Sequence, residues 1–431
     1  MKFKINLETS FMTHHHRYII RPWFTKHLLY KHNMYRVKDK TDVLYHKSPN
    51  FWHGRVVESM EKVISPPEIF PGTEKTEEKP RSDHDAPAWL TATEYQDVSS
   101  SLEMKSDTLA ELLLASKKTV LYTGAGISAS VIGQAAKSGV NKVGWVGKGV
   151  HAQPTMTHYI LSQLVRENLI HSWIQQNHDG LPQKAGCPQH KINEIHGAWF
   201  DPSNPVVKYS GSLRNDLYSW MKESAKTADL VIALGTSLSG LNADRMVVDC
   251  AEREGSLGSV MINLQQTQLD GMMSLKIYGK TDDVLSSLVE RLHEKGKLKQ
   301  TSQDFLKSCE KLQNWSELLK MNRYKFKIPY DKNGNKLLKK DGEMPGDKSR
   351  WTTWDLSENA RVKLHRKNNC KGSEQPSYVK LPGVIGAVVG FDDQAKSVVV
   401  GFGRSKSVYV GGWWIEAAMN GTVDTLPIVN V

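Results

Sequence analysis

The stretch TVLYTGAGIS, residues 119–128, decides the fold of this chain. Its first four residues are apolar or β-branched and predict a buried strand, which runs directly into Gly124, Ala125 and Gly126. Glycines in this place let the backbone approach a pyrophosphate closely, and the N-terminus of a following helix directs amides and a positive dipole toward it. Because such turns are also common as purely structural features, the motif by itself leaves both explanations open.

The segments on both sides of this stretch alternate between helix and strand. The predicted helices cover 108–115, 158–168, 217–226 and 283–293, and the further predicted strands cover 170–175, 230–234 and 260–264. This alternation favours a parallel sheet with helices on both faces, which is a Rossmann-like α/β fold.

Three more motifs place polar residues at or just after the ends of predicted strands. They are QNHDGL at 176–181 with EIHG at 194–197, GTSL at 235–238, and the pair Ile262-Asn263. Because polar groups at the carboxyl ends of the strands in a doubly wound sheet face the ligand crevice, we expect these motifs to line one site.

The motifs GAGIS, QNxDGL, E-I-HG, GTSL and IN, taken in this order, resemble those of the sirtuins, the NAD-dependent protein deacylases. The resemblance covers a little under half of the chain and implies that NAD is the cofactor and an acyl-lysine protein the substrate. It implies that the pyrophosphate and neighbouring ribose contact Gly124, Ala125, Gly126 and Ser128, the nicotinamide ribose Gln176, the nicotinamide amide Asp179, and the adenosine half Gly235, Thr236, Ser237 and Asn263.

The same resemblance implies two catalytic residues. Asn177 would order the water of the site, and His196 would be the general base, with an imidazole pKa suited to work near neutrality. In the family this histidine accepts a proton through the ribose hydroxyls, after the acyl oxygen has attacked the ribose carbon and nicotinamide has left.

The chain departs from the sirtuin pattern at three places. Most sirtuins continue after GAGIS with Gly-Ile-Pro-Asp-Phe-Arg, whereas residues 129–136 of this chain are ASVIGQAA. His178 stands where an apolar residue usually follows the QN pair, and the V-x-F-G-E substrate strand appears only as VKYSG at 207–211. In most sirtuins the Phe and Arg of the first run cover the nicotinamide end of NAD, and both are missing here. These departures leave open how that end is covered and whether the substrate strand is kept.

The sequence also lacks most of the segments that form the zinc-binding small domain in the family. The insertions after Ser128 and after His196 are short, and no paired cysteines lie between them. The four cysteines of the chain, Cys187, Cys250, Cys309 and Cys370, form no C-x-x-C pair. We therefore predict a reduced small domain without structural zinc, no metal site, and four reduced thiols in a reducing compartment.

Two interpretations of the site stay open at this point. His196 is either the general base or an inherited structural histidine, and Asn177 and Asp179 could persist to satisfy buried backbone groups, which are costly to leave unpaired. The chain is accordingly a protein-lysine deacylase or an NAD-cleaving variant of one, or else a degenerate sirtuin fold that serves as a structural or NAD-sensing subunit of a large assembly. Whether it is an enzyme is thus left undecided by the sequence.

The flanking segments complete the predicted organisation: 1–88, a basic, aromatic-rich extension and linker; 89–296, the NAD-binding domain; 297–350, a helix over 300–321 and a lysine-rich connector; 351–431, a β-rich SH3-like barrel. Within the barrel, Asp392-Asp393 stands at a hairpin position, and 409–415 is predicted as a strand. The basic, acid-poor N-terminus suits a mitochondrial address, and both flanks suit contacts with a protein partner or a larger assembly.

The charge of the chain is uneven. From Lys297 to the end there are 23 Lys/Arg against 14 Asp/Glu, a surplus of 9 out of the net +11. This surplus favours an anionic partner, and nucleic acid bound by the C-terminal part is a weaker third hypothesis. No apolar stretch approaches the roughly 18 residues that a membrane helix needs, so no transmembrane segment is predicted.

Overall fold

The computed structural model describes residues 67–70, 93–133, 149–207, 211–238, 242–301, 303–307, 324–337, 348–365, 385–403 and 407–431. All of them belong to one unit, Leu44–Val431. The predicted N-terminal extension, except for residues 67–70 with strand β1 (Glu68–Ile69), lies outside the described residues, as does most of the predicted helix over 300–321. The lysine-rich connector is described over 324–337 and 348–350, and part of it forms a strand. Short strand β1 pairs with β2 (Tyr95–Gln96).

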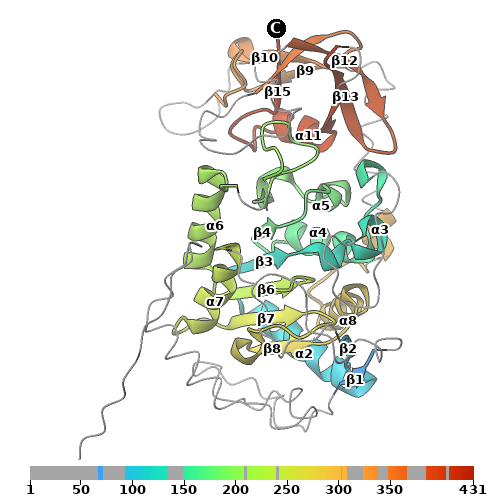
Figure 1. Ribbon diagram of the computed structural model, residues 1–431, viewed down its shortest axis with the longest axis vertical. Helices are drawn as coiled ribbons and strands as arrows, with labels where there is room; N and C mark the ends of the chain where they lie inside the picture. The colour runs from blue at the N-terminus through green and yellow to red at the C-terminus, as the bar shows by residue number, and fades with distance from the viewer. Residues whose placement is uncertain are drawn as a thin grey trace, which may run out of the picture. The chain divides into compact units, whose positions relative to one another are not determined.

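A six-stranded parallel sheet forms the centre of the α/β domain, by which we mean the described residues from 93 to 301 (Figure 1). Its strands are β3 (Thr119–Thr123), β4 (Ser172–Gln175), β5 (Ile192–Glu194), β6 (Leu230–Leu234), β7 (Gly258–Ile262) and β8 (Leu275–Ile277), in the spatial order β5-β4-β3-β6-β7-β8. The strand order reverses at β3, whose neighbours are β4 on one side and β6 on the other. Ligands of such sheets bind at this switch point, and the glycine motif follows β3 directly.

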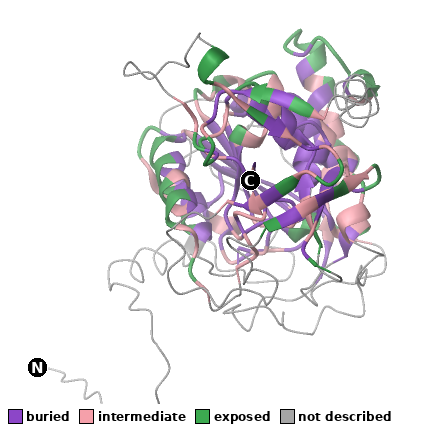
Figure 2. Cartoon of the chain, turned by 90° about the horizontal axis from the view of Figure 1, so that it is seen from above, coloured by how far each residue is buried: buried purple, intermediate pink, exposed green. Residues whose placement is uncertain are grey.

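Helices cover both faces of this sheet. One layer contains α2 (Ser99–Ala115), α4 (Met156–Arg166) and α8 (Thr281–Glu294), and the other contains α6 (Asn215–Thr227) and α7 (Arg245–Glu252) (Figure 1). Every residue of β3 and β6 is buried. Figure 2 shows buried residues gathered in the interior and exposed residues mostly at the outside. The sequences of these central strands are thus nearly continuous apolar runs, as expected of a parallel sheet that is covered on both faces.

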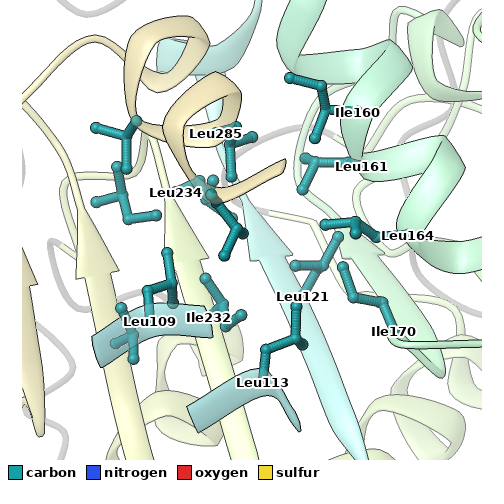
Figure 3. Close-up of a cluster of buried hydrophobic side chains, with 14 of the residues drawn as sticks. Leu109, Leu113, Leu121, Ile160, Leu161, Leu164, Ile170, Ile232, Leu234 and Leu285 are labelled. Carbon is teal, nitrogen blue, oxygen red and sulfur yellow. The ribbon is translucent and has the colours of Figure 1, made fainter. Parts of the chain in front are cut away.

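Leucine and isoleucine side chains from four different elements fill the core on the α8 side of the sheet. Leu109 of α2, Leu121 of β3, Ile232 of β6 and Leu285 of α8 converge there, and each is at most 3% exposed (Figure 3). Burying one such side chain contributes roughly 1.5–3 kcal/mol relative to leaving it exposed. The core therefore fixes the sheet whose carboxyl edge carries the motifs.

The predicted α/β fold with a parallel sheet is confirmed. The predicted helices and strands of this domain are present with shifts of a few residues, except that α2 begins at Ser99 rather than at residue 108. The sequence did not reveal β5, β8 or α7, because elements of three to eight residues carry little periodicity.

The C-terminal module, by which we mean the described residues from 324 to 431, is built mainly of antiparallel strands. Its five-stranded sheet has the order β14-β13-β12-β11-β15, and a separate two-stranded ribbon pairs β9 with β10. The strands are β9 (Lys325–Ile328), β10 (Thr352–Asp355), β11 (Arg361–Leu364), β12 (Ile385–Asp392), β13 (Ser397–Gly401), β14 (Ser407–Gly411) and β15 (Ile428–Asn430). The hairpin expected at Asp392-Asp393 is confirmed by the pairing of β12 with β13.

One prediction for this module is wrong. The sequence favours a strand over 409–415, but β14 ends at Gly411, and Trp413 and Trp414 open a helix, α11 (Trp413–Met419). A Cβ on Gly411 would lie 2.2 Å from the indole of Trp413, so the bare glycine backbone accommodates the ring and lets the chain turn. Both tryptophans are buried in the core of the module, which also includes Phe326.

Candidate functional site

The loops after β3 and β6 meet backbone to backbone at the switch point, and we call Gly124, Gly126 and Gly235 the glycine end of the site. A Cβ on Gly126 would lie 2.6 Å from the Cα of Gly235, and one on Gly124 would lie 2.8 Å from the carbonyl oxygen of Gly235. Gly235 has φ +56°, and its own Cβ would lie 2.6 Å from the amide nitrogen of Ile127. Only glycine fits this crossing, so close packing accounts for all three glycines.

The amides of all three glycines are already used within the protein, that of Gly235 by the carbonyl oxygen of Ile262 at 3.1 Å. Gly124 donates to the carbonyl oxygen of Leu234 at 3.1 Å, and Gly126 donates to that of Gly235 at 2.8 Å. Ala125 and Gly126 are nevertheless exposed at the carboxyl edge, whereas Gly124 is buried. The two exposed residues therefore present the surface that a phosphate group could approach.

Gln176, expected at the nicotinamide ribose, and the residues expected to contact adenosine lie beside the glycine end. Gln176, after β4, donates from Nε2 to the hydroxyl of Thr236 at 3.3 Å, and Asn263, after β7, donates from Nδ2 to the carbonyl oxygen of Thr236 at 3.2 Å. Ser237 follows Thr236 and is half-buried. The structure thus brings the polar residues after three strands together at one edge of the sheet.

A buried hydrogen-bond network surrounds Asp179, and we call Ser128, His158 and Asp179 the aspartate end of the site. The hydroxyl of Ser128 donates to Oδ2 of Asp179 at 2.7 Å, while Oδ1 accepts from the amide of Leu181 at 3.1 Å and from Gln175 at 3.3 Å. Asn177 donates to the hydroxyl of Ser128 at 3.2 Å and to the carbonyl oxygen of Gly124 at 3.0 Å. Ser128 is 2% exposed, so its side chain serves mainly to hold this carboxylate.

His158 belongs to this network although the sequence did not single it out. Its Nδ1 accepts from the amide of Thr155 at 3.2 Å, so the proton sits on Nε2, which lies 3.3 Å from the hydroxyl of Ser128. Complete burial lowers the pKa of His158 to about 4, although Asp179 and Asp282 act against this shift. The reciprocal bonds of Thr155 and His158 at the start of α4 form a capping box, and this local pattern was the signal that could have identified His158.

His196 lies next to the loop that carries Asp179. Its ring bonds to the backbone of Gln176, and burial lowers its pKa to about 4, with a further lowering by the nearby charge of His178. This pKa lies below the value near neutrality that the resemblance implies. The imidazole is unprotonated at neutral pH and can accept a proton there, but as a weaker base than the resemblance suggested.

His178, which replaces the usual apolar residue, is tied into the same loop. Its Nδ1 donates to the carbonyl oxygen of Gly197 at 2.9 Å, and its own carbonyl oxygen accepts from the amide of Trp199. Gly197 has φ +91°, and a Cβ there would lie 2.3 Å from the carbonyl oxygen of Pro205. The substitution thus links the loops that follow β4 and β5.

Two further buried ionisable side chains lie close to the site. Burial raises the pKa of Glu194 to about 8, and the charge of Asp201 raises it further. Burial lowers the pKa of Lys184 to about 8, and its Nζ donates to the carbonyl oxygens of Val150 and Ala152. Such shifts are frequent near functional sites but also occur in structural networks.

The described residues contain no group of three or more His, Cys, Asp or Glu side chains placed to hold a metal ion. Cys187 and Cys250 are buried, while Cys309 and Cys370 lie outside the described residues. The run 134–136 and most of the segment 207–211 also lie outside them. The reduced small domain and the lack of zinc therefore stay predictions. Within the described part of the chain, no helix is long and apolar enough to cross a bilayer.

Sequence comparison assigns relatives to the part of the chain that carries these motifs. The NAD-dependent protein deacetylase SRT1 of Arabidopsis thaliana is 29% identical over 248 residues, which are 47% of this chain and 52% of that protein. The NAD-dependent protein deacetylase sirtuin-7 of Bos taurus is 28% identical, over 44% of this chain and 60% of that protein. Over this part, the chain is similar to the sirtuins.

The sirtuin-like part is about 44% of the chain, and the chain spans about half the length of the plant relatives that it matches. No family model matches. Among solved structures, a Sir2 with a deacetylated p53 peptide and 3'-O-acetyl ADP ribose is 22% identical, with a TM-score of 0.39, over 44% of this chain and 98% of that one. The relatives are NAD-dependent deacetylases, which agrees with the function and cofactor expected from the motifs.

Proposed function

We propose that the sirtuin-like part binds NAD along the carboxyl edge of its parallel sheet and acts as an NAD-dependent protein-lysine deacylase. The observation that carries the proposal is the convergence at this edge of residues from four strands' loops: Ala125, Gly126, Gln176, Thr236 and Asn263. Their sequence separation is large, so their meeting is a property of the fold, and their chemistry suits a dinucleotide.

The residues present fit the cofactor. The loop after β3 exposes only Ala125 and Gly126, the two smallest residue types, where a pyrophosphate would approach. Asn263 and Thr236 place amide and hydroxyl groups on the adenosine side, and the carboxylate of Asp179 can accept from the nicotinamide amide. When bound, NAD supplies the ribose carbon that receives the acyl oxygen.

The chain's own residues have separate tasks in this proposal. Asp179 and Gln176 orient the nicotinamide riboside, and Asn177 orders the water of the site. His196, unprotonated because burial lowers its pKa to about 4, accepts the proton that leaves the ribose hydroxyls. A general base of this kind contributes typically about 10²–10⁴-fold to the rate.

The test measures NAD binding by calorimetry and nicotinamide release in the same sample, with and without an acetyl-lysine peptide. We expect binding, and release that depends on the peptide and falls at least about 100-fold in His196→Ala. His171→Ala is the matched control, since His171 is half-buried at the opposite end of β4 and should keep full activity. Release that is equal in both variants would remove His196 from catalysis.

A second candidate function, a structural or NAD-sensing subunit of a larger assembly, is favoured by one observation. Asn177 donates to the hydroxyl of Ser128, which in turn donates to the buried carboxylate of Asp179. They could therefore be retained for the fold alone. In this alternative the N-terminal extension and the C-terminal module, as an SH3-like barrel, would make the contacts, with a mitochondrial location.

The same experiment separates the two candidates. Binding of NAD without peptide-dependent release would support an NAD-sensing subunit, and no binding would support a structural one. Peptide-dependent release would exclude both versions of the second candidate.

A further inference from the structure

The loop that carries Asp179 is held from two sides. From the α/β domain, Ser128 and the amide of Leu181 bond the carboxylate of Asp179. From the other side, the neighbouring Gly180 lies against aromatic rings: a Cβ there would be 2.7 Å from Cδ2 of Phe200 and 3.0 Å from Cη2 of Trp413. Gly180 has φ +61°, so a side chain is excluded by both backbone conformation and space.

One of these rings comes from the C-terminal module. Trp413 is the first residue of α11 and is 3% exposed. A Cβ on Gly411 would lie 2.2 Å from its Cε2 and Cζ2, and its Cη2 faces Gly180. The six-membered ring of the indole thus lies between Gly411 of the module and Gly180, which follows Asp179.

Phe200 connects the same two parts. It is 1% exposed and belongs to the hydrophobic core of the C-terminal module, although it follows β5 of the α/β domain. Its ring packs edge-on against Trp413, with centroids 5.3 Å apart at 67°, and its carbonyl oxygen accepts from the amide of Gly411 at 3.2 Å. An aromatic pair of this geometry adds roughly 0.5–1.5 kcal/mol beyond its buried area.

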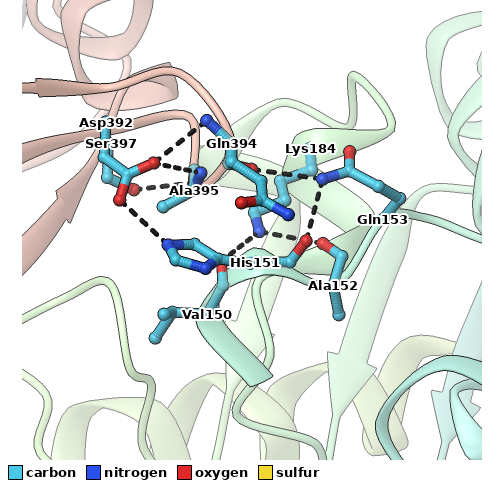
Figure 4. Close-up of polar contacts among 9 residues, drawn as sticks. All are labelled: Val150, His151, Ala152, Gln153, Lys184, Asp392, Gln394, Ala395 and Ser397. Carbon is cyan, nitrogen blue, oxygen red and sulfur yellow. Dashed lines mark hydrogen bonds and ion pairs between the residues drawn. The ribbon is translucent and has the colours of Figure 1, made fainter. Parts of the chain in front are cut away.

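A second set of contacts docks the module independently of Trp413. His151 lies 3.0 Å from Asp392, and Gln153 donates to the carbonyl oxygen of Gln394 at 3.2 Å (Figure 4). In the same figure Lys184 donates to the carbonyl oxygens of Val150 and Ala152. Because these polar contacts do not involve the indole, trimming Trp413 should loosen the Asp179 loop without releasing the module.

We propose that Trp413 is a positioning residue of the sirtuin-like site: through Gly180 it holds the Asp179 carboxylate in the orientation that receives the nicotinamide end of NAD. The C-terminal module is then part of the site and more than an appended contact domain. The proposal rests on the proposed NAD binding, but the holding of the loop itself can be measured without NAD.

The test uses the full chain and two matched variants, Trp413→Phe and Trp414→Phe. Phenylalanine keeps an aromatic ring in the core but lacks the Cη2 atom that reaches Gly180. Trp414 has the same residue type on the same helix and is 5% exposed, so its replacement controls for the general cost of trimming this core. Both variants are first checked for cooperative thermal unfolding.

Two readouts are compared. Amide hydrogen exchange over residues 178–184 should be faster in Trp413→Phe than in Trp414→Phe, because local opening of the loop becomes easier. The Kd for NAD should rise about fivefold if the competent loop conformation falls to about one fifth of the population. The Kd for ADP-ribose, which lacks nicotinamide and cannot use Asp179 in this way, should stay within about twofold.

The outcomes separate cleanly. Equal exchange in the two variants overturns the proposal, and so does an equal loss of affinity for NAD and ADP-ribose, which would indicate a merely structural role. If the unchanged protein binds no NAD, the proposed function fails, while the exchange comparison still decides whether Trp413 holds the loop. If Trp413→Phe does not fold, Gly180→Ala disturbs the same contact from the other side, with Gly255→Ala as the control for positive φ.

Discussion

At the glycine end of the site the backbone of one loop lies directly against the backbone of another, whereas at the aspartate end the contacts run through side chains. Gly126 and Gly235 leave no room for a Cβ, while Ser128, His158 and Asp179 are linked by hydrogen bonds. The first end should therefore be sensitive to added volume, and the second to lost polarity and to pH. Both ends serve one edge of the sheet, but different changes should break them.

The largest effect is expected from Gly235→Ala. A side chain at φ +56° costs about 1–2 kcal/mol. The collision with the amide nitrogen of Ile127 at 2.6 Å adds about 1–3 kcal/mol, because backbone must move. Gly255→Ala is the control: its φ is +76° but nothing lies within 4 Å, so only the backbone strain should appear.

Urea unfolding of the two variants tests this expectation. The free energy of unfolding should fall further in Gly235→Ala than in Gly255→Ala by about 1–3 kcal/mol. If the two losses of unfolding free energy are the same, the close crossing of the loops does not make Gly235 sensitive to added volume. The proposed difference between the two ends of the site would then be wrong.

The aspartate end should make the free energy of unfolding depend on pH. Burial lowers the pKa of His158 to about 4 in the folded protein, from 6.5 for an ordinary histidine. The unfolded chain therefore binds the proton first, so stability is complete above pH 6.5 and is lost as the pH falls from 6.5 toward 4. The loss from this residue alone is about 3 kcal/mol at most.

Unfolding measured at pH 7.5 and pH 4.5 for the unchanged protein and for His158→Gln isolates this contribution. Other groups with shifted pKa values, such as His196 and Glu194, are present in both proteins and cancel in the comparison. We expect the variant to lose about 2–3 kcal/mol less between the two pH values. An unchanged acid dependence would show that His158 is solvated in the native state.

The difference between the two ends also explains how far the sequence could predict the site. Gly124, Gly126 and Gly235 stand in short motifs after apolar strands, and the grouping of Gln176, Thr236 and Asn263 follows from the rule that parallel strands end at one edge. These predictions needed only local pattern and fold class.

The capping box could identify His158 locally, but its contact with Ser128 and the role of Trp413 depend on residues that are distant in sequence. His158 meets Ser128 only because α4 packs beside the loop after β3, and Trp413 meets Gly180 from a module more than two hundred residues away in sequence. The strand predicted through Trp413 failed because β-branched and aromatic residues favour a strand locally, while the glycine pair before it allows the chain to turn into a helix.

The smallest effect is expected from Ser128→Ala, which removes one donor to the buried Asp179 carboxylate. The carboxylate keeps its bonds from Leu181 and Gln175, so the free energy of unfolding should fall by only about 1–2 kcal/mol. Ser130→Ala, on the exposed side of α3 (Ala129–Ile132), should cost less than about 0.5 kcal/mol and controls for helix propensity. A loss in Ser128→Ala as large as that in Gly235→Ala would mean that the side-chain network is as rigid as the backbone crossing. The two ends of the site would then form one inflexible structure, and the loop carrying Asp179 would need no support from Trp413.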